Sequence, residues 1–168
     1  MKTVIREASE QDAPAISRIY AASWKAAYRG MVPQQFLDEL SDDFWTNKFS
    51  TWLGSSTLRA GILQVDEVPA GCVAFGESRD EKLPEWGEIV SIYLHPDFFR
   101  KGLGTKLLGY AANELKAAGY PACFLWVLRE NRNAQNFYEK NGFVGNGDIC
   151  HSEIMGTLMT DIRYCAIL

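Results

Sequence analysis

The chain has 168 residues, of which 47% are hydrophobic, 12% aromatic and 23% charged. A chain of this length and composition buries enough surface to fold without a metal or a disulfide framework. Seventeen Lys and Arg against 21 Asp and Glu give a net charge of −4, which argues against a protein that mainly coats nucleic acid or an anionic membrane. No repeat or linker divides the sequence, so we expect a single domain over residues 1–168.

Cysteine spacing and hydropathy narrow the class of protein further. The four cysteines form no Cys-x-x-Cys pair, and the two histidines complete no zinc-ligand spacing. We therefore expect no metal, and we expect Cys72 and Cys123 to be small buried residues in the reduced state. The sequence shows neither the apolar segment of a signal peptide nor an apolar stretch of ~20 residues, so we expect a cytoplasmic protein without a membrane span.

The first third of the chain is expected to hold one strand and three helices. Alternation predicts a strand over Thr3–Ala8, and a capping-box pattern at Ser9 starts a helix that Gly30 ends. A short helix over Pro33–Leu40 and a third helix over Ser41–Gly54 follow. The residues that recur at helical spacing are Ile16, Ile19, Tyr20, Trp24 and Ala27, then Trp45, Phe49, Trp52 and Leu53.

The hydrophobic period changes from helical to strand-like in the middle of the chain. Strands are predicted over Leu58–Val65, Pro69–Gly76 and Glu85–Leu94, and the polar pair Asp66-Glu67 forms the turn between the first two. The segment Glu88–Leu94 is apolar on both of its alternating faces, which indicates a central strand rather than an edge strand.

The last part of the chain alternates between helix and strand. A helix is predicted from about Lys101 to Gly119, followed by a buried strand over Ala122–Leu128 and a helix from Arg132 to Gly142. The last two predicted strands are Phe143–Cys150 and Leu158–Ile167.

A glycine-bearing loop follows the central strand and carries the first chemical signal. Gly102 and Gly104 stand where a helix begins, and free backbone N–H groups at such a terminus bind phosphate oxygens. Arg100, Lys101 and Lys106 add positive charge, although a tight turn with a solvated basic rim is an equally good interpretation. Two phosphate motifs are rejected, because a leucine stands where a P-loop or a dinucleotide fingerprint needs glycine.

A second segment, Asn131–Phe143, follows the buried strand in the same way. It contains every position of the pattern Asn-x-x-Ala-x-x-Phe-Tyr-x-x-x-Gly-Phe. Together with the glycine loop, it resembles the GNAT superfamily of acetyl-CoA-dependent N-acetyltransferases, and the likeness extends over almost the whole chain. The loop departs from the family pattern at one position, because Phe99 stands where the family has Gln or Arg.

The resemblance implies an α/β (α+β) fold with a mixed sheet of about seven strands. The sheet would be mostly antiparallel, with a splayed parallel pair formed by Glu88–Leu94 and Ala122–Leu128, and helices would flank it. In the family, acetyl-CoA lies between these two strands. The residues that the resemblance places at the cofactor are Ile92, Tyr93 and Leu94 along the pantetheine, Arg100, Lys101, Gly102, Leu103, Gly104 and Thr105 at the pyrophosphate, and Asn131 near the thioester.

Two residues are candidates for the acid and base of acyl transfer. Tyr138 matches the family tyrosine that protonates the departing thiolate, although its sequence context alone favours a core aromatic residue. Glu88 stands where some relatives keep a base, and an acid in an apolar strand favours a functional location. A solvated carboxylate at the strand end is the alternative reading of Glu88, and Glu85 or a water chain are its substitutes as base.

The acceptor site is the least defined part of the prediction. The resemblance implies that Trp24, Tyr28 and Arg29 line it together with Glu88, although a core position for Trp24 is the simpler interpretation. Some acidic residues suit a cationic amine or are solvated charges; these are Asp38, Glu39, Asp42, Asp43, Glu85 and Glu88. We expect acetyl transfer from acetyl-CoA to a primary amine of a small molecule or peptide, with a homodimer through the C-terminal edge strands. The alternatives are a non-catalytic acyl-CoA-binding sensor and a nucleotide-phosphate-binding protein.

Overall fold

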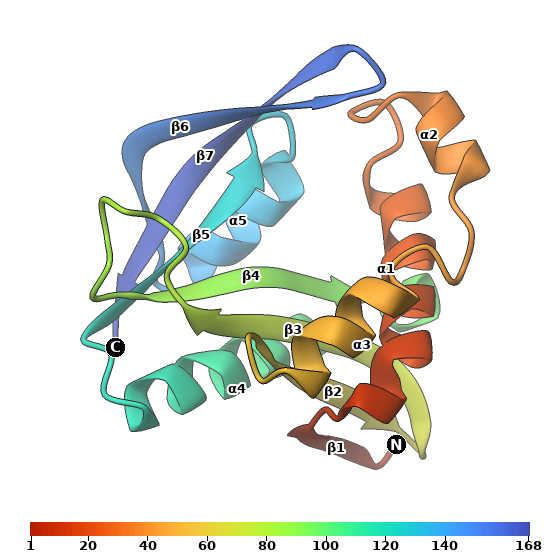
Figure 1. Ribbon diagram of the computed structural model, residues 1–168, viewed down its shortest axis with the longest axis horizontal. Helices are drawn as coiled ribbons and strands as arrows, with labels where there is room; N and C mark the ends of the chain where they lie inside the picture. The colour runs from red at the N-terminus through yellow and green to blue at the C-terminus, as the bar shows by residue number, and fades with distance from the viewer.

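Seven strands form one mixed sheet in the order β1-β2-β3-β4-β5-β7-β6, and the computed structural model describes residues 1–168 (Figure 1). The strands are β1 Thr3–Glu7, β2 Arg59–Val65, β3 Val68–Glu77, β4 Gly87–Leu94, β5 Ala122–Leu128, β6 Val144–Ile154 and β7 Thr157–Ile167. The helices are α1 Ala13–Ala27, α2 Gln34–Glu39, α3 Thr46–Gly54, α4 Leu103–Ala117 and α5 Arg132–Lys140, with 3₁₀ turns η1 Glu10–Asp12 and η2 Pro96–Phe98. Every neighbouring pair is antiparallel except β4 and β5, which confirms the predicted fold class.

Helices cover both faces of the sheet because the central strands are apolar on both sides. On β2, Leu63 and Val65 belong to the same buried cluster as Leu107 of α4. The alternate residues Ala60 and Ile62 instead pack in a cluster with α1 and α3. Successive side chains of a strand point to opposite faces, so α4 covers one face and α1 with α3 covers the other.

Two helices begin later than the sequence pattern predicts. The backbone N–H of Ser9 donates to the Asp12 carboxylate at 2.8 Å, but this capping box closes η1, and α1 starts directly after it. The Ser41 hydroxyl donates to Asp43 at 2.8 Å within a turn, and α3 begins only at Thr46. Local side-chain hydrogen bonds of Ser and Asp stabilise turns as well as helix starts, which explains both errors.

The C-terminal hairpin is longer than the sequence pattern predicts. Strand β6 continues past Cys150 to Ile154, and β7 begins at Thr157. The two residues between them, Met155 and Gly156, have φ values of 49° and 79°. Positive φ at both positions is what a two-residue type I′ hairpin turn requires. The residues that flank this turn are mostly polar or small, so a hydrophobicity pattern does not detect the ends of the two strands.

The tip of this hairpin lies beside α2 and the segment that follows α1 (Figure 1). The contact is a small apolar cluster that joins parts of the chain far apart in sequence. Its buried residues are Val32, Leu37 and Met159, and the partly buried residues packed against them are Trp24, Tyr28, Phe36, Leu128 and Ile154. The hairpin and the N-terminal helices therefore enclose one end of the space next to β4.

The parallel pair β4 and β5 separates soon after it forms. Only Gly87 and Glu88 of β4 pair with β5, opposite Cys123 and Phe124. Beyond Glu88, the edge of β4 that faces β5 has no strand partner, while β5 continues along β7. The resulting gap between the strands is the splay that the family resemblance predicts.

A bulge on β4 explains where the strands diverge. The adjacent residues Ala74 and Phe75 of β3 pair with Ser91 and Ile89, so Val90 is an extra residue on β4. A bulge bends its strand and increases its local twist, and this bend turns the second half of β4 away from β5.

The cysteines agree with a further expectation from the sequence. All four cysteines are free thiols, and Cys72 and Cys123 are buried, which confirms their assignment as small core residues. Burial raises the pKa of both thiols, so neither is an activated nucleophile. No helix in the structure has the length and hydropathy needed to cross a membrane.

Candidate active site

A cavity of about 890 Å³ occupies the gap between β4 and β5 and extends to α1 and the β6–β7 hairpin. We call it the splay cavity. Most of the site residues expected from the sequence line it; these are Trp24, Tyr28, Glu88, Ile92, Tyr93, Leu94, Arg100, Gly104, Asn131 and Tyr138. The side chain of Arg29 is exposed and lies outside the cavity lining. Lys101, Gly102, Leu103 and Thr105 belong to the adjoining loop and first turn of α4.

Backbone N–H groups between η2 and α4 are free over a continuous stretch. None of the residues from Arg100 to Thr105 donates a backbone hydrogen bond outside the regular elements, and the first N–H groups of a helix have no partner within it. Arg100 and Gly102 adopt left-handed φ values of 60° and 71°, which delays the start of α4 to Leu103. Free donors, a helix N-terminus and the Arg100 guanidinium together fit a pyrophosphate.

Glycine is required at position 104 for a different structural reason than at position 102. A Cβ at Gly102 would meet nothing within 4 Å, so its φ, and not space, favours glycine. A Cβ at Gly104 would lie 3.3 Å from the Phe137 ring, so this glycine lets α4 approach α5 closely. One position sets the loop conformation and the other sets the helix packing.

Two neighbouring side chains of the loop do not act as free cations or donors. The Lys101 ammonium donates to the Asp97 carbonyl at 3.0 Å and lies 5.1 Å from the Phe98 ring centre. Phe99, which replaces the family's Gln or Arg, is partly exposed and lines the splay cavity. It offers a bound molecule apolar contact instead of a hydrogen bond.

Tyr138 of α5 lines the splay cavity. The residue is 8% exposed, and its ring packs against Phe137, Phe143 and Tyr164 at centroid distances of 5.2, 6.0 and 6.4 Å. Burial raises the pKa of Tyr138 well above its ordinary value, and the nearby Tyr28 adds to the shift. The hydroxyl therefore stays protonated at neutral pH and is able to donate a hydrogen bond.

Asn131 holds the junction between β5 and α5. Its side-chain oxygen accepts a hydrogen bond from the Ala134 N–H at 3.2 Å, so it caps the helix that carries Tyr138. The Gln135 amide reinforces the junction by donating to the carbonyls of Leu128 and Arg129 at 3.2 and 2.8 Å. Asn131 also lines the cavity, so the capping and cofactor-facing positions that the sequence allowed are compatible.

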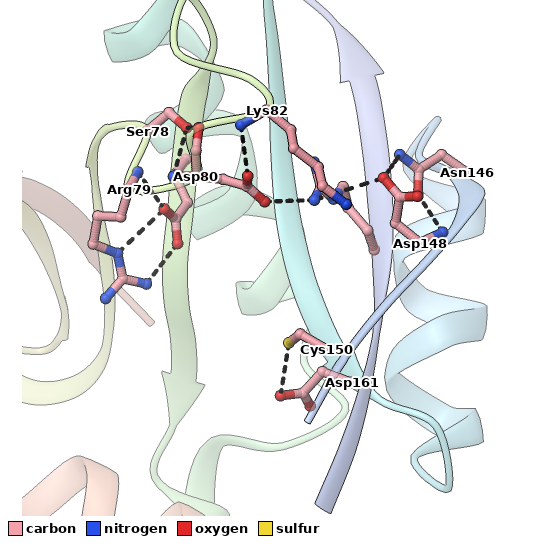
Figure 2. A network of polar contacts seen from close by, with 10 residues as sticks. Ser78, Arg79, Asp80, Lys82, Asn146, Asp148, Cys150 and Asp161 are labelled. Atoms are coloured by element: carbon pink, nitrogen blue, oxygen red, sulfur yellow. Dashed lines mark hydrogen bonds and ion pairs between the residues drawn. The ribbon is translucent and has the colours of Figure 1, made fainter. Parts of the chain in front are cut away.

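Glu88 is buried rather than solvated, and Arg79 binds it. The Arg79 guanidinium donates to Oε1 at 3.2 Å and to Oε2 at 2.5 Å, and the Arg79 backbone N–H donates to Oε1 at 3.0 Å (Figure 2). Glu88 is only 3% exposed. The hydrogen bonds to Glu88 are the main cause of the raised pKa of Arg79. Sequence reasoning missed Arg79, because its loop carries no motif.

Aromatic side chains form the wall between α1 and β4. The hydroxyls of Tyr28 and Tyr93 lie 3.0 Å apart, and the Trp24 and Tyr28 rings meet edge to face with centroids 4.8 Å apart. Tyr20 contacts the Ser91 hydroxyl with its own. Burial raises the pKa of Tyr28 and of Tyr93, so both remain neutral hydrogen-bonding groups.

Asp161 on β7 is a further acid in the splay cavity that sequence reasoning missed. Its nearest polar partner is the Cys150 thiol, at 4.0 Å. Burial and the neighbouring Glu130 raise the pKa of Asp161. An acid within the apolar strand Leu158–Ile167 is the same signal that identified Glu88, so the sequence did contain a means of finding it.

Arg163, two residues further along β7, is engaged elsewhere. It is 2% exposed, with its guanidinium 2.5 Å from Asp80 and 3.6 Å from Asp148 and its centre 4.5 Å from the Trp126 ring. Figure 2 shows Asp80 and Asp148 together in this polar network, while Cys150 and Asp161 form a separate pair. No group of three or more His, Cys, Asp or Glu side chains is arranged to hold a metal ion.

Comparison with known proteins identifies the class that this fold and site define. Residues 14–143 match the model of the Acetyltransferase (GNAT) family. The match covers more than half of the chain, so the chain belongs to the GNAT family, as its two motifs indicate. It is an acetyl-CoA-dependent acyltransferase.

Individual relatives agree with this assignment. An uncharacterized N-acetyltransferase of Bacillus subtilis, YuaI, is 30% identical over 129 residues, or 76% of this chain and 72% of the relative. A spermidine N(1)-acetyltransferase of Thermoplasma acidophilum is 26% identical over 144 residues, or 85% of this chain and 89% of the relative.

Solved structures share the fold over the full length. The PaiA N-acetyltransferase of Thermoplasma acidophilum, in complex with coenzyme A, superposes with a TM-score of 0.75 and 22% identity and covers 100% of both chains. YncA of Salmonella typhimurium, with its cofactor acetyl-CoA, gives a TM-score of 0.76 and 20% identity and covers 99% of this chain and 94% of its own.

Proposed function

We propose that the protein transfers the acetyl group of acetyl-CoA directly to a primary amine of a small molecule or peptide. The observation that supports this most strongly is the position of Tyr138, a protonated, buried phenol in the same cavity as the open edge of β4. The amine nitrogen attacks the thioester carbonyl, the C–S bond breaks, and the thiolate takes the phenol proton of Tyr138. The amine loses one proton in the same reaction, so one proton is released for the one that Tyr138 gives to the thiolate, and Tyr138 is reprotonated before the next turnover.

The cofactor would be held mainly by main-chain groups. The free amides from Arg100 to Thr105 bind the pyrophosphate, and the unpaired edge of β4 along Ile92, Tyr93 and Leu94 binds the pantetheine arm. A backbone N–H of the same edge serves the developing oxyanion. Asn131 lies at the thioester end, where it also caps α5.

Glu88 would accept the amine proton through water rather than directly. Arg79 donates all three hydrogen bonds that reach the Glu88 carboxylate, so a bound amine meets a carboxylate that is already paired. Lone pairs not used by Arg79 remain for a water molecule, and proton transfer through one water is compatible with general base catalysis. This assignment combines the two candidates that the sequence suggested, Glu88 and a water chain.

The likeness to a spermidine acetyltransferase makes small polyamines the first acceptors to test. Release of CoA from acetyl-CoA should be measured with polyamines, aminoglycosides, amino acids and N-terminal peptides. Turnover on at least one amine is expected. Binding of acetyl-CoA without turnover on any of them would instead favour a non-catalytic acyl-CoA sensor, for which Phe99 is the one supporting residue.

The catalytic role of Tyr138 has a matched control within the same cluster. Tyr138→Phe should lower kcat about a hundredfold or more and leave acetyl-CoA affinity nearly unchanged, because general acids contribute about 10²–10⁴-fold. Tyr164→Phe removes a neighbouring hydroxyl that donates to Glu139 at 2.8 Å outside the cavity, and it should leave kcat nearly unchanged. Equal turnover by both variants would contradict the assignment.

Two further expectations accompany this proposal, one on the oligomeric state and one on the location in the cell. A homodimer through the β6 edge is supported by exposed apolar residues on the hairpin, among them Val144 and Leu158, which are 68% and 67% exposed. Light scattering at several concentrations tests it, and a monomer at all concentrations would exclude it. A cytoplasmic location is likewise proposed, and fractionation of cells that produce the protein tests it.

A further inference from the structure

The splay cavity contains a carboxylate without a cationic partner. Its acidic lining residues are Glu88 and Asp161. Arg79 neutralises Glu88, whereas Asp161 makes no ion pair and has only the Cys150 thiol within reach, at 4.0 Å. A partly buried carboxylate without a hydrogen-bonded cation costs folding free energy. A ligand that supplies the missing positive charge offsets that cost.

No cation of the protein is placed to fill this role. The basic side chains in the cavity lining are Arg79, which binds Glu88, and Arg100, which belongs to the glycine loop. Arg163 shares a strand with Asp161 but is bonded to Asp80. Figure 2 shows the pair Cys150 and Asp161 apart from the contacts of Arg79 and from those of Asp80.

The surroundings of Asp161 suit an alkylammonium group. Asp161 lies opposite Leu128 of β5 and Cys150 of β6 in the strand registers. Tyr28 lines the same cavity as Asp161, and the charge of Asp161 contributes to the raised pKa of Tyr28. Tyr28 and Leu128 also pack against the cluster that closes this end of the cavity. A carboxylate beside aromatic and aliphatic side chains binds an ammonium on a hydrocarbon chain through its charge, its methylenes and cation–π contact.

We propose that Asp161 binds an ammonium group of the acceptor, and that the acceptor carries a second amino group, which receives the acetyl. A carboxylate partner stabilises the protonated form of an amine, whereas the attacking nitrogen has to lose its proton. The nitrogen held by Asp161 is therefore not the reacting one. The acceptor class that follows is an aliphatic diamine or polyamine. This inference rests on the proposed function and assigns the specificity of the same site.

The test compares diamines with a monoamine of similar chain length. Binding of spermidine, of α,ω-diaminoalkanes with three to six carbons, and of n-butylamine to the CoA-bound protein is measured by calorimetry. At least one diamine or spermidine should bind the parent about tenfold or more tightly than butylamine. Asp161→Asn should reduce that preference to about twofold or less.

Two controls separate direct contact from other effects. Glu130→Gln removes a nearby exposed acid that does not line the cavity, so it should keep the preference. Asn has the shape of Asp, and unchanged acetyl-CoA affinity together with a cooperative thermal transition verifies the fold of Asp161→Asn. The inference fails if the parent does not prefer diamines, if Asp161→Asn keeps the preference, or if Glu130→Gln loses as much of it.

A parallel turnover assay distinguishes this inference from the proposed function. For the favoured diamine, Asp161→Asn should raise KM about tenfold or more with little change in kcat, while kcat/KM for butylamine stays as in the parent. Diamines that bind through Asp161 without releasing CoA would contradict the transferase function, and with it acetyl transfer to the second amino group, while the ammonium site at Asp161 would stand. CoA release to diamines that is unaffected by Asp161→Asn would contradict this inference and not the function.

Discussion

The cofactor half and the acceptor half of the splay cavity are built from different parts of the protein. The cofactor half consists of main-chain groups on one continuous segment, from the open edge of β4 through the glycine loop to α4. The acceptor half consists of side chains from distant elements, including Tyr28 on α1, Glu88 on β4 and Asp161 on β7. Backbone geometry therefore governs one half, and charge pairing between elements governs the other.

Breaking the ion pair of the acceptor half should have the largest effect on stability. Arg79→Met leaves Glu88, which is 3% exposed, without its guanidinium, and we expect a loss of about 2–3 kcal/mol in the free energy of unfolding. The double variant Arg79→Met, Glu88→Gln should recover part of that loss, since a neutral amide costs less to bury than a charge. Urea unfolding of the parent and the variants measures both effects.

A small effect would contradict this view of the pair. The Arg79 side chain is 59% exposed, and pairs that are fully in solvent contribute about 0–1 kcal/mol. If Arg79→Met costs no more than that, Glu88 is reached by water in solution. Charge pairing would then be no more important for the acceptor half than it is for the cofactor half.

The cofactor half should respond to backbone strain instead. Gly102→Ala forces a side chain into a φ of 71°, which costs about 1–2 kcal/mol. We expect acetyl-CoA affinity to fall about tenfold if the loop relaxes away from its binding conformation, with diamine selectivity unchanged. Calorimetric titration with acetyl-CoA measures the affinity.

A glycine within α4, the helix that follows the loop, supplies the control for this prediction. A Cβ at Gly109 meets nothing within 4 Å and its φ is not positive, so Gly109→Ala should leave acetyl-CoA affinity unchanged. It should raise stability by about 0.5–1 kcal/mol through helix propensity. Equal losses of affinity in both variants would show that α4 as a whole, and not the loop conformation, controls cofactor binding.

The same difference explains what the sequence was able to predict. The glycine loop and the segment Asn131–Phe143 are local patterns, so the sheet class, the splayed pair and the position of Tyr138 followed from them. The Arg79–Glu88 and Asp80–Arg163 pairs join residues up to 83 positions apart, and no local pattern specifies such contacts. Asp161 is an acid within an apolar strand, so the criterion that identified Glu88 also applies to it. Arg29 was expected at the acceptor site, but it does not line the splay cavity.

Helix and strand ends were predicted less well for a related reason. Ser41 is a sound capping residue, and its hydroxyl does bond to Asp43, yet the chain forms a turn there and α3 begins at Thr46. The backbone N–H of Trp45, just before that helix, instead donates to the Ser17 hydroxyl of α1 at 2.9 Å. A contact between two helices thus sets the start of one of them, and sequence periodicity carries no information about it.

Asp161 should show the smallest effect on stability, and an effect opposite in sign to that of Arg79. Burial and Glu130 raise its pKa above 3.8 in the folded protein, so the folded state prefers the protonated acid. Stability from this group is fully present below the ordinary pKa and is lost as the pH rises through the folded value. Asp161→Asn should therefore be slightly more stable than the parent at pH 7, and the difference should vanish toward pH 3.

Urea unfolding of both proteins across this pH range measures the difference. The other titratable or charged groups around Asp161 are the same in both proteins; they are Glu130, Cys150, Tyr28 and Arg163. If Asp161→Asn is instead less stable at pH 7, the carboxylate has a stabilising partner within the fold. A saturating diamine should reverse the order, because it binds the folded parent more tightly than the variant and stabilises it by mass action. Asp161 would then lower stability when the cavity is empty and raise it when an ammonium is bound, as expected of a residue that recognises a ligand. The charge of Glu88, in contrast, is already compensated by Arg79 within the protein.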